Sequence, residues 1–337
     1  MSDLKINNIT DRTGGSGPVI AGVSTVTSTG AFTVPVGPTD HRGGRGRGVF
    51  AGSATPSYTN VMDYVEIATT GNATDFGDLD TNWYNIGGCA SSTRGIWFPG
   101  YDGTNPVSSI YYITISSNGG VADFGDTLNA SRNHNGACSD STRGVRAEGY
   151  KTSISARTNV LEYITIASTG NSSQFGDLNR VVSDMAGTFA SPTRGFFCGG
   201  KPETNIIDYI TIQTKGNGID FGDLIDGTRA EGAGASNTTR GLCFGGSGPG
   251  ANDTIQYITM ATLGNAVDFG NLHGDVEASG ACASSTRGLN AGGTTPTKIN
   301  TIDYVTISSA GNATDFGDRT TAGFGVGACS DVHGGLG

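Results

Sequence analysis

The stretch Gly280-Ala-Cys-Ala-Ser-Ser-Thr-Arg-Gly-Leu-Asn-Ala-Gly-Gly293, continued by Ile302-Asp-Tyr-Val-Thr-Ile307 and Asp315-Phe-Gly-Asp318, decides the fold. Its wording recurs six times along the 337 residues, with small substitutions. The phenylalanine of the last element recurs at spacings of 48, 51, 46, 48 and 47 residues, at Phe76, Phe124, Phe175, Phe221, Phe269 and Phe316. A repeat of this length, built from short apolar runs and glycine-rich turns, is typical of one supersecondary unit copied around an axis.

Each copy predicts four short antiparallel strands, which we name a to d in chain order. In the last copy, residues 280–285 form strand a and residues 289–293 form strand b, which ends at paired glycines. Residues 302–307 alternate apolar and polar side chains, the pattern of a strand with two different faces. Gly311 and Asn312 suit a tight hairpin, and residues 315–318 form a short outer strand or turn. Because four short strands cannot bury both faces alone, each unit needs a neighbour on either side.

The small residues of strand a predict how the units are arranged. Gly, Ala, Ser and Cys recur in this quarter of every copy, and they fit where wedge-shaped blades crowd around a common axis. A recurring tyrosine in strand c and the recurring phenylalanine are expected to fill the space between blades. We therefore predict an all-β fold, a six-bladed β-propeller of four-stranded antiparallel blades.

The ends of the repeat predict how the ring closes. The first copy starts with strand b at Arg47-Gly-Val-Phe50 and has no convincing strand a before it, whereas Gly327-Ala-Cys-Ser-Asp331 reads as a strand a with no blade after it. The C-terminal strand is therefore expected to complete the first blade, so that residues 44–337 form the ring.

Residues 1–43 are expected to form a β-rich arm outside the ring. Two short strand-like runs, Val23–Thr29 and Ala31–Val36, surround Gly30, and a flexible break covers Asp11–Pro18. An arm of this length is too short for its own core. It is expected to lie on the ring or to dock on a partner, and we favour the partner, with homo-oligomerisation left open.

Composition excludes several function classes. A net charge of −10 argues against broad nucleic-acid binding, which needs a basic face. No apolar run is long enough to span a membrane, and no signal segment opens the sequence. The six cysteines lie in strands a and b of different copies, which are related by rotation, so disulfides are not expected. Free buried thiols fit assembly in a reducing cytoplasm.

One arginine opens strand b in every copy: Arg47, Arg94, Arg143, Arg194, Arg240 and Arg287. The a–b and c–d turns of a meander share one face, so these arginines are expected to ring one mouth of the channel. The identical residue in each blade favours a structural role, paired with the Asp-Phe-Gly-Asp carboxylates, over an anion-binding ring.

The repeated Asp-Phe-Gly-Asp raises two metal questions. The motif resembles the magnesium-binding motif of protein kinases, but the nucleotide loop and the catalytic loop that accompany it in kinases do not occur in this sequence. The two carboxylates of each copy could also bind calcium, with Asn72, Asn217 or Asn312 nearby. Calcium needs six to eight oxygen ligands, and two carboxylates supply too few unless backbone carbonyls contribute. We favour turn capping and ion pairing, and expect no metal or other cofactor.

Binding is favoured over catalysis because what varies between copies is one set of loops. The b–c and d–a loops share the other face of the ring and differ in every blade, the arrangement of a binding surface on a constant scaffold. Five aromatic residues lie on or beside these loops and are candidate binding residues for a glycan or a protein: Tyr58, Trp83, Tyr84, Tyr101 and Tyr150. The four histidines are scattered, and no serine-nucleophile elbow occurs, so no catalytic residue is assigned. The alternative is a glycan-processing enzyme, which an asymmetric histidine or carboxylate cluster would favour.

The repeat resembles the kelch repeat, a four-stranded propeller blade, over about residues 44–337. The resemblance rests on an arginine before strand a (Arg132, Arg180 and Arg229), on Gly-Gly after strand b, and on an aromatic strand c. Kelch blades usually carry a tryptophan in strand d, where this sequence has phenylalanine.

The near-verbatim copies also resemble repeat proteins of marine bacteriophages, especially those of cyanobacteria. Two phrases carry this resemblance: Ala68-Thr-Thr-Gly-Asn-Ala-Thr-Asp-Phe-Gly-Asp-Leu79 and Val26-Thr-Ser-Thr-Gly-Ala-Phe-Thr-Val-Pro35. It implies a virion component assembled in the host bacterial cytoplasm: a tail, neck or head appendage whose arm, residues 1–43, is held by other virion proteins.

Overall fold

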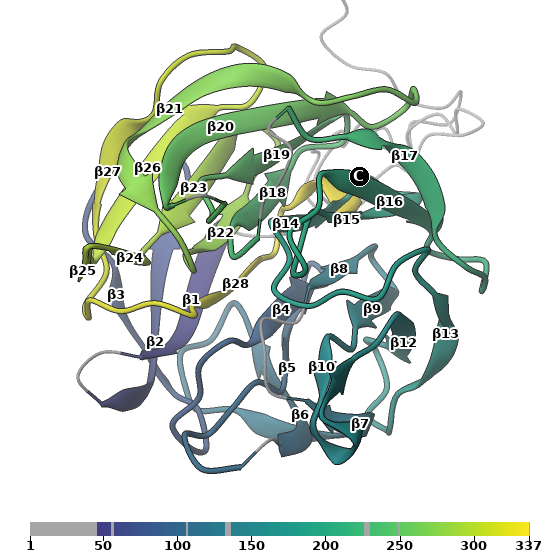
Figure 1. Ribbon diagram of the computed structural model, residues 1–337. Coiled ribbons are helices and arrows are strands. Elements are labelled where there is room, and N and C mark those ends of the chain that lie inside the picture. Colours follow the sequence, from purple (N-terminus) through teal and green to yellow (C-terminus); the bar gives the residue numbers. More distant parts are fainter. Residues whose placement is uncertain are drawn as a thin grey trace, which may run out of the picture. The chain divides into compact units, whose positions relative to one another are not determined.

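The computed structural model describes residues 46–54, 57–105, 107–131, 136–225, 230–248 and 250–336, and the expected arm, residues 1–43, lies outside them. The described residues form six four-stranded antiparallel blades of a β-propeller, so the predicted fold class is confirmed (Figure 1). Strand a lies innermost and strand d outermost in every blade.

The strands are given blade by blade, in the order a, b, c, d. Blade 1 contains β28 (Gly327–Ser330), β1 (Arg47–Ala54), β2 (Tyr58–Glu66) and β3 (Thr74–Asp78). Blade 2 contains β4 (Gly87–Ala90), β5 (Arg94–Phe98), β6 (Val107–Thr114) and β7 (Ala122–Ser131). Blade 3 contains β8 (Ala137–Ser139), β9 (Arg143–Ala147), β12 (Val160–Thr165) and β13 (Ser173–Asp177).

Blade 4 contains β14 (Gly187–Ala190), β15 (Arg194–Cys198), β16 (Ile206–Thr211) and β17 (Ile219–Asp223). Blade 5 contains β18 (Ala233–Ser236), β19 (Arg240–Phe244), β20 (Asn252–Thr259) and β21 (Val267–Val276). Blade 6 contains β22 (Gly280–Ala283), β23 (Arg287–Ala291), β26 (Thr301–Thr306) and β27 (Thr314–Asp318). The b–c loops add β10 (Tyr150–Lys151), the 3₁₀ turn η1 (Thr152–Ile154), β11 (Ala156–Arg157), β24 (Thr294–Thr295) and β25 (Thr297–Lys298). A second 3₁₀ turn, η2, covers Gly334–Leu336.

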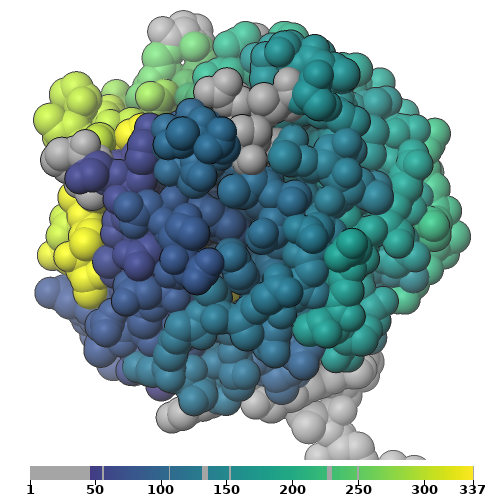
Figure 2. All heavy atoms as spheres, turned by 90° about the horizontal axis from the view of Figure 1, so that it is seen from below, coloured from purple at the N-terminus to yellow at the C-terminus, as the bar shows by residue number. Residues whose placement is uncertain are grey.

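The C-terminal strand closes the ring, as the sequence predicts. β28 pairs antiparallel with β1, with Val49 opposite Cys329 and Ala51 opposite Gly327. The purple residues of β1 and the yellow C-terminal residues therefore lie side by side in Figures 1 and 2. In blade 2, Ser91 Oγ caps the a–b turn by accepting from the backbone N–H of Arg94 (3.1 Å). In blade 1 no a–b turn joins β28 to β1. There Asp331 Oδ1 accepts from the N–H of Arg47 (2.8 Å), so the same capping hydrogen bond forms between two separate strands.

The glycine of Thr-Arg-Gly is explained by the neighbouring blade. A side chain of strand a points at it: the Sγ of Cys89 lies 2.8 Å from where a Cβ on Gly144 would stand, and the Sγ of Cys138 lies 2.5 Å from that of Gly195. Cys282 and Cys329 point in the same way at Gly48 of blade 1 and at Gly95 of blade 2. All six cysteines are free and buried, so the predicted free thiols are confirmed.

The Asp-Phe-Gly-Asp motif also acts between blades. A Cβ on its glycine would stand between 2.1 and 2.5 Å from the carbonyl oxygen of the glycine in the next blade's c–d turn, in all six blades. That close approach lets the turn hydrogen-bond to strand d: the N–H of Gly119 donates to the carbonyl of Phe76 (2.8 Å). In five seams an asparagine side chain completes the contact, as where the Asn171 Oδ1 accepts from the N–H of Asp126 (3.0 Å). We call this contact the outer clasp.

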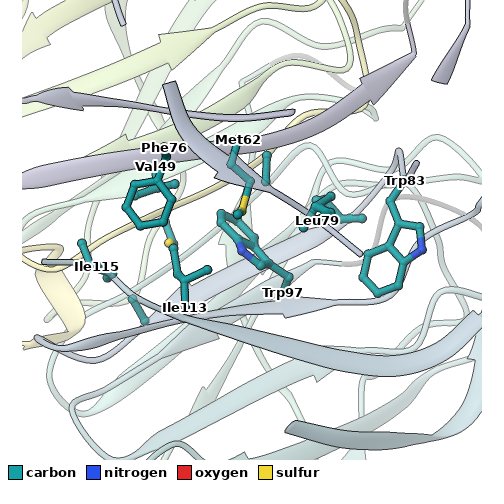
Figure 3. Packing of buried hydrophobic residues seen from close by; sticks show 12 residues of the cluster. Val49, Met62, Phe76, Leu79, Trp83, Trp97, Ile113 and Ile115 are labelled. Carbon is teal, nitrogen blue, oxygen red and sulfur yellow. The ribbon is translucent and has the colours of Figure 1, made fainter. Parts of the chain in front are cut away.

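Apolar side chains fill the seams between blades. The core cluster in Figure 3 joins Val49 and Met62 of blade 1 to Trp97 and Ile113 of blade 2. Within each blade the recurring tyrosine meets the recurring phenylalanine edge-to-face, as for Tyr64 and Phe76 (ring centroids 6.0 Å apart). The aromatic repeat therefore serves packing.

Candidate functional site

The b–c and d–a loops gather on one face of the ring, which we call the variable face. Three of the five predicted aromatic residues meet there. The rings of Tyr58 and Tyr84 stack with centroids 4.7 Å apart and planes 11° apart, and Tyr101 lies edge-on to Tyr84 at 5.6 Å. They come from the b–c loop side of blades 1 and 2 and from the d–a loop between those blades.

Phe324 and Lys298 extend this aromatic group and were missed from the sequence. Phe324, from the last d–a loop, lies edge-on to Tyr84 (6.1 Å), and the Lys298 Nζ lies 5.3 Å from the centroid of the Phe324 ring. Backbone hydrogen bonds between Phe324 and Ala54, at 2.8 and 3.2 Å, hold the loop against blade 1. Phe324 was detectable as an aromatic residue in a loop of the variable class. We call Tyr58, Tyr84, Tyr101 and Phe324 the aromatic platform.

Trp83 and Tyr150 are not part of the platform. Trp83 is 1% exposed and packs in the core cluster of blades 1 and 2, with its ring 5.0 Å from that of Tyr111 (Figure 3). Its prediction as a binding residue is therefore wrong. Tyr150 lies on β10 in blade 3, whereas the platform is made by blades 1, 2 and 6.

The six arginines lie at the start of strand b, but their expected pairing with the Asp-Phe-Gly-Asp carboxylates is wrong. Each guanidinium lies over the tyrosine of its own strand c, at 4.3 to 4.7 Å from the ring centroid. Its Nη1 donates to a carbonyl at the c–d turn of the next blade, as from Arg94 to Ile166 (3.0 Å), and Arg287 completes the circle at Ile67 (3.0 Å). The arginines therefore lie at the seams and do not line the channel.

The channel along the axis is narrow and lined by small residues of strand a. It holds two cavities of about 80 and 50 Å³, bordered chiefly by Gly, Ala, Ser, Thr and Cys. The C-terminal residues plug its end away from the variable face. His333 Nδ1 accepts from the N–H of Gly335 (3.1 Å), so Nε2 carries the proton and donates to the carbonyl of Ala90 (2.8 Å), with Ser139 Oγ 3.3 Å away.

Burial lowers the pKa of the His333 imidazole, while its hydrogen bond to Ala90 and the nearby Asp140 carboxylate oppose that shift. Below pH ~6.5 the folded protein then binds fewer protons than the unfolded chain. The contribution of His333 to the free energy of unfolding therefore decreases as the pH falls from there. We expect the melting temperature of wild type to fall more steeply than that of His333→Gln between pH 8 and pH 5.5, measured by calorimetry.

His273 provides the control for that experiment. Its Nδ1 lies 2.5 Å from Asp303 Oδ1, and this hydrogen bond raises the His273 pKa, so its contribution grows at lower pH and is lost as the pH rises. The melting temperature of His273→Asn should therefore fall more steeply than that of wild type between pH 8 and pH 5.5, the opposite of the change expected for His333→Gln. Equal slopes for wild type and His333→Gln would contradict the buried neutral imidazole.

At the opposite end of the channel, the d–a loops form a ring of backbone contacts. One residue of each described d–a loop has a positive φ, and in four of these five loops its N–H donates to the carbonyl at the same position in the preceding blade. Ala278 donates to the carbonyl of Glu231 (2.6 Å), and Glu231 donates to that of Asp184 (3.0 Å). Among the described residues of this ring, the acidic side chains are those of Asp184 and Glu231, which lie in neighbouring loops on one side. There Lys201 Nζ pairs with Glu231 Oε1 (2.6 Å), and burial together with Glu231 raises the pKa of Glu277.

Among the described residues, no three His, Cys, Asp or Glu side chains stand close enough together to hold a metal ion. The asparagines considered as calcium ligands serve the outer clasp: Asn72, Asn217 and Asn312 each accept a backbone N–H of the preceding blade at 3.1 Å. No helix in the part of the chain that the structure describes is long and apolar enough to cross a membrane.

No protein-family model and no curated protein matches the sequence.

Proposed function

We propose that the protein is a non-enzymatic binding component of a bacteriophage virion, a tail, neck or head appendage built from kelch-like blades. In this proposal the variable face turns outward to a host-surface glycan or protein. Residues 1–43 anchor the ring to other virion proteins. The resemblance of the repeat wording to marine phage proteins motivates the virion location.

The aromatic platform is the observation that supports binding. Four aromatic rings from blades 1, 2 and 6 meet on the face that carries the loops that differ between blades. Tyr58 is 36% exposed although it stacks on Tyr84, so its ring offers an apolar plane to solvent. Such planes pack against the C–H faces of sugars and against protein anchor residues.

Truncation of the platform tests the binding. Tyr58→Ala removes the exposed ring without opening the core, and we expect at least about a tenfold loss of affinity for host cells, roughly 1.4 kcal/mol. Leu263→Ala is the control, because Leu263 is 63% exposed at a c–d turn on the opposite face of the ring. Equal binding by wild type and Tyr58→Ala would refute the platform, and normal incorporation of residues 44–337 into particles would refute anchoring by the arm.

The alternative, a glycan-processing enzyme, is favoured by the one-sided acidic group at the channel. Burial raises the pKa of the Glu277 carboxyl group and the nearby Glu231 adds to that shift; glycosidases likewise raise the pKa of one of two neighbouring carboxyl groups. Incubation of the same purified protein with host-surface polysaccharide distinguishes the two. Release of products that Glu277→Gln abolishes would establish the enzyme, whereas binding without products supports the proposal above.

A further inference from the structure

The b–c loop of blade 3 builds a groove against blade 2. Its residues form β10, η1 and β11, and β10 pairs with the outer strand β7 through Lys151 and Ser131. β7 has ten residues, whereas β13, the outer strand of blade 3, has five. The groove beside the extended end of β7 has a volume of about 620 Å³, within the usual range of small-ligand sites, ~300–1,000 Å³.

The residues that line the groove combine polar groups with one large exposed aliphatic side chain, that of Leu128, and Ile154 lies beside them. Ser108 Oγ donates to Asp126 Oδ1 (3.0 Å), and Thr127 Oγ1 lies 3.1 Å from the Ser108 carbonyl oxygen. Leu128 also lines the groove and is 46% exposed, and Ile154, next to the lining residue Ser153, is 60% exposed. Asp126 is the one charged side chain among the described lining residues. Hydroxyl and carboxylate groups beside aliphatic ones suit a neutral polyhydroxylated ligand.

Leu128 is exposed because its side chain has no part in joining the blades. At the equivalent position in blade 1, Asp80 accepts from the hydroxyl of Tyr111 in the next blade (3.0 Å). In blade 2 the backbone N–H of Leu128 makes the contact instead, donating to Glu162 Oε2 (2.8 Å). The leucine side chain is thereby left at the groove, where burial by a ligand would be favourable.

The groove and the aromatic platform flank a single loop. Tyr101 stands near the start of the b–c loop of blade 2, and Ser108 stands just after its end, at the beginning of β6. Both surfaces belong to the variable face. We propose that this face binds an extended neutral oligosaccharide, with part of the chain on the platform and a further part in the groove. This inference rests on the binding function proposed above and adds the ligand class and a second subsite.

Length dependence of binding tests the second subsite. We would measure calorimetric affinities for neutral gluco- and chito-oligosaccharides, as dimers and hexamers, with sulfated forms for comparison. Wild type should bind a neutral hexamer at least about tenfold more tightly than the dimer. Leu128→Asp and Ile154→Asp should reduce hexamer affinity to that of the dimer and leave the dimer unchanged. Leu263→Asp is the matched control, since Leu263 is 63% exposed at a c–d turn on the other face.

The outcomes separate this inference from the function on which it rests. Hexamer binding that survives both groove substitutions, or that exceeds dimer binding by no measurable factor, would overturn the second subsite and leave the platform intact. Tighter binding of the sulfated forms would overturn the neutral ligand class. Absence of saccharide binding by wild type across the panel would overturn the inference together with glycan binding by the platform.

Discussion

Deleting residues 325–337 is expected to leave no stably folded protein. The deletion removes β28, the strand a of blade 1, and with it the register between Val49 and Cys329. It also removes Val326, Val332 and Leu336, each less than 6% exposed. Each buried Val or Leu contributes roughly 1.5–3 kcal/mol, so the loss is comparable with the ~5–15 kcal/mol that stabilises a typical domain. β1 would in addition become an exposed edge strand that favours aggregation.

A shorter deletion is the control for the closing strand. Removal of residues 332–337 keeps β28 and takes away only the plug of the channel. We expect this variant to fold with a lowered melting temperature, whereas the longer deletion aggregates during expression or melts without a cooperative transition. Calorimetry and light scattering would measure both. A protein lacking residues 325–337 that melts like the full-length chain would show that blade 1 does not need its fourth strand.

Replacing Gly241 by alanine is expected to destabilise the ring by about 3 kcal/mol, at the upper end of the usual cost of overpacking a core. A Cβ at Gly241 would stand 1.9 Å from the ring of Phe189, which is buried and stacked on Phe196. Gly288 is the matched control at the same register, because blade 5 presents Ala235 where blade 4 presents Phe189. There the nearest atom, Cδ1 of Leu242, lies 3.1 Å away.

Gly288→Ala should therefore cost less than about 1 kcal/mol, the more so because alanine restricts the unfolded chain. The double variant Gly241→Ala/Phe189→Ala places alanine opposite alanine, the pairing that Gly288→Ala creates against Ala235 of blade 5. Its loss should be smaller than the sum of the two single losses by more than ~1 kcal/mol, since the residues are in direct contact. Denaturant midpoints would be measured for wild type, Gly241→Ala, Phe189→Ala, the double variant and Gly288→Ala. Equal losses of unfolding free energy in Gly241→Ala and Gly288→Ala would contradict the view that the glycine of Thr-Arg-Gly makes room for a side chain of the neighbouring blade.

The sequence predicted the architecture because period-two strands and turn residues are local signals. The ring closure was also predictable, since an unpaired strand a at one end matched a missing one at the other. The partners of the repeated arginines were not. Every residue has a backbone carbonyl, so the sequence does not indicate that the carbonyl of Ile166 accepts from an arginine. An arginine with such a partner cannot be distinguished in the sequence from one that pairs with a carboxylate.

The candidate site was predicted only in part, for a related reason. Tyr58, Tyr84 and Tyr101 were found because they stand in variable loops, but position in a loop does not decide exposure. Trp83 stands beside Tyr84 in the chain and yet turns into the core. Phe324 joins Tyr84 across 240 residues of sequence, a proximity that exists only once the last blade meets the first.

The closed circle of blades has a consequence for how the molecule comes apart. In an open stack of repeats, a terminal repeat has one neighbour, so the stack can lose units from its ends at the cost of one interface each. Here every blade is held on two sides, and the first break anywhere in the circle must sever an arginine contact, an outer clasp and an apolar seam before any strand gains freedom. Local fraying is therefore penalised at all six positions. Near-identical repeats in a linear stack would unfold one after another from the ends, whereas in this closed ring we expect them to unfold cooperatively.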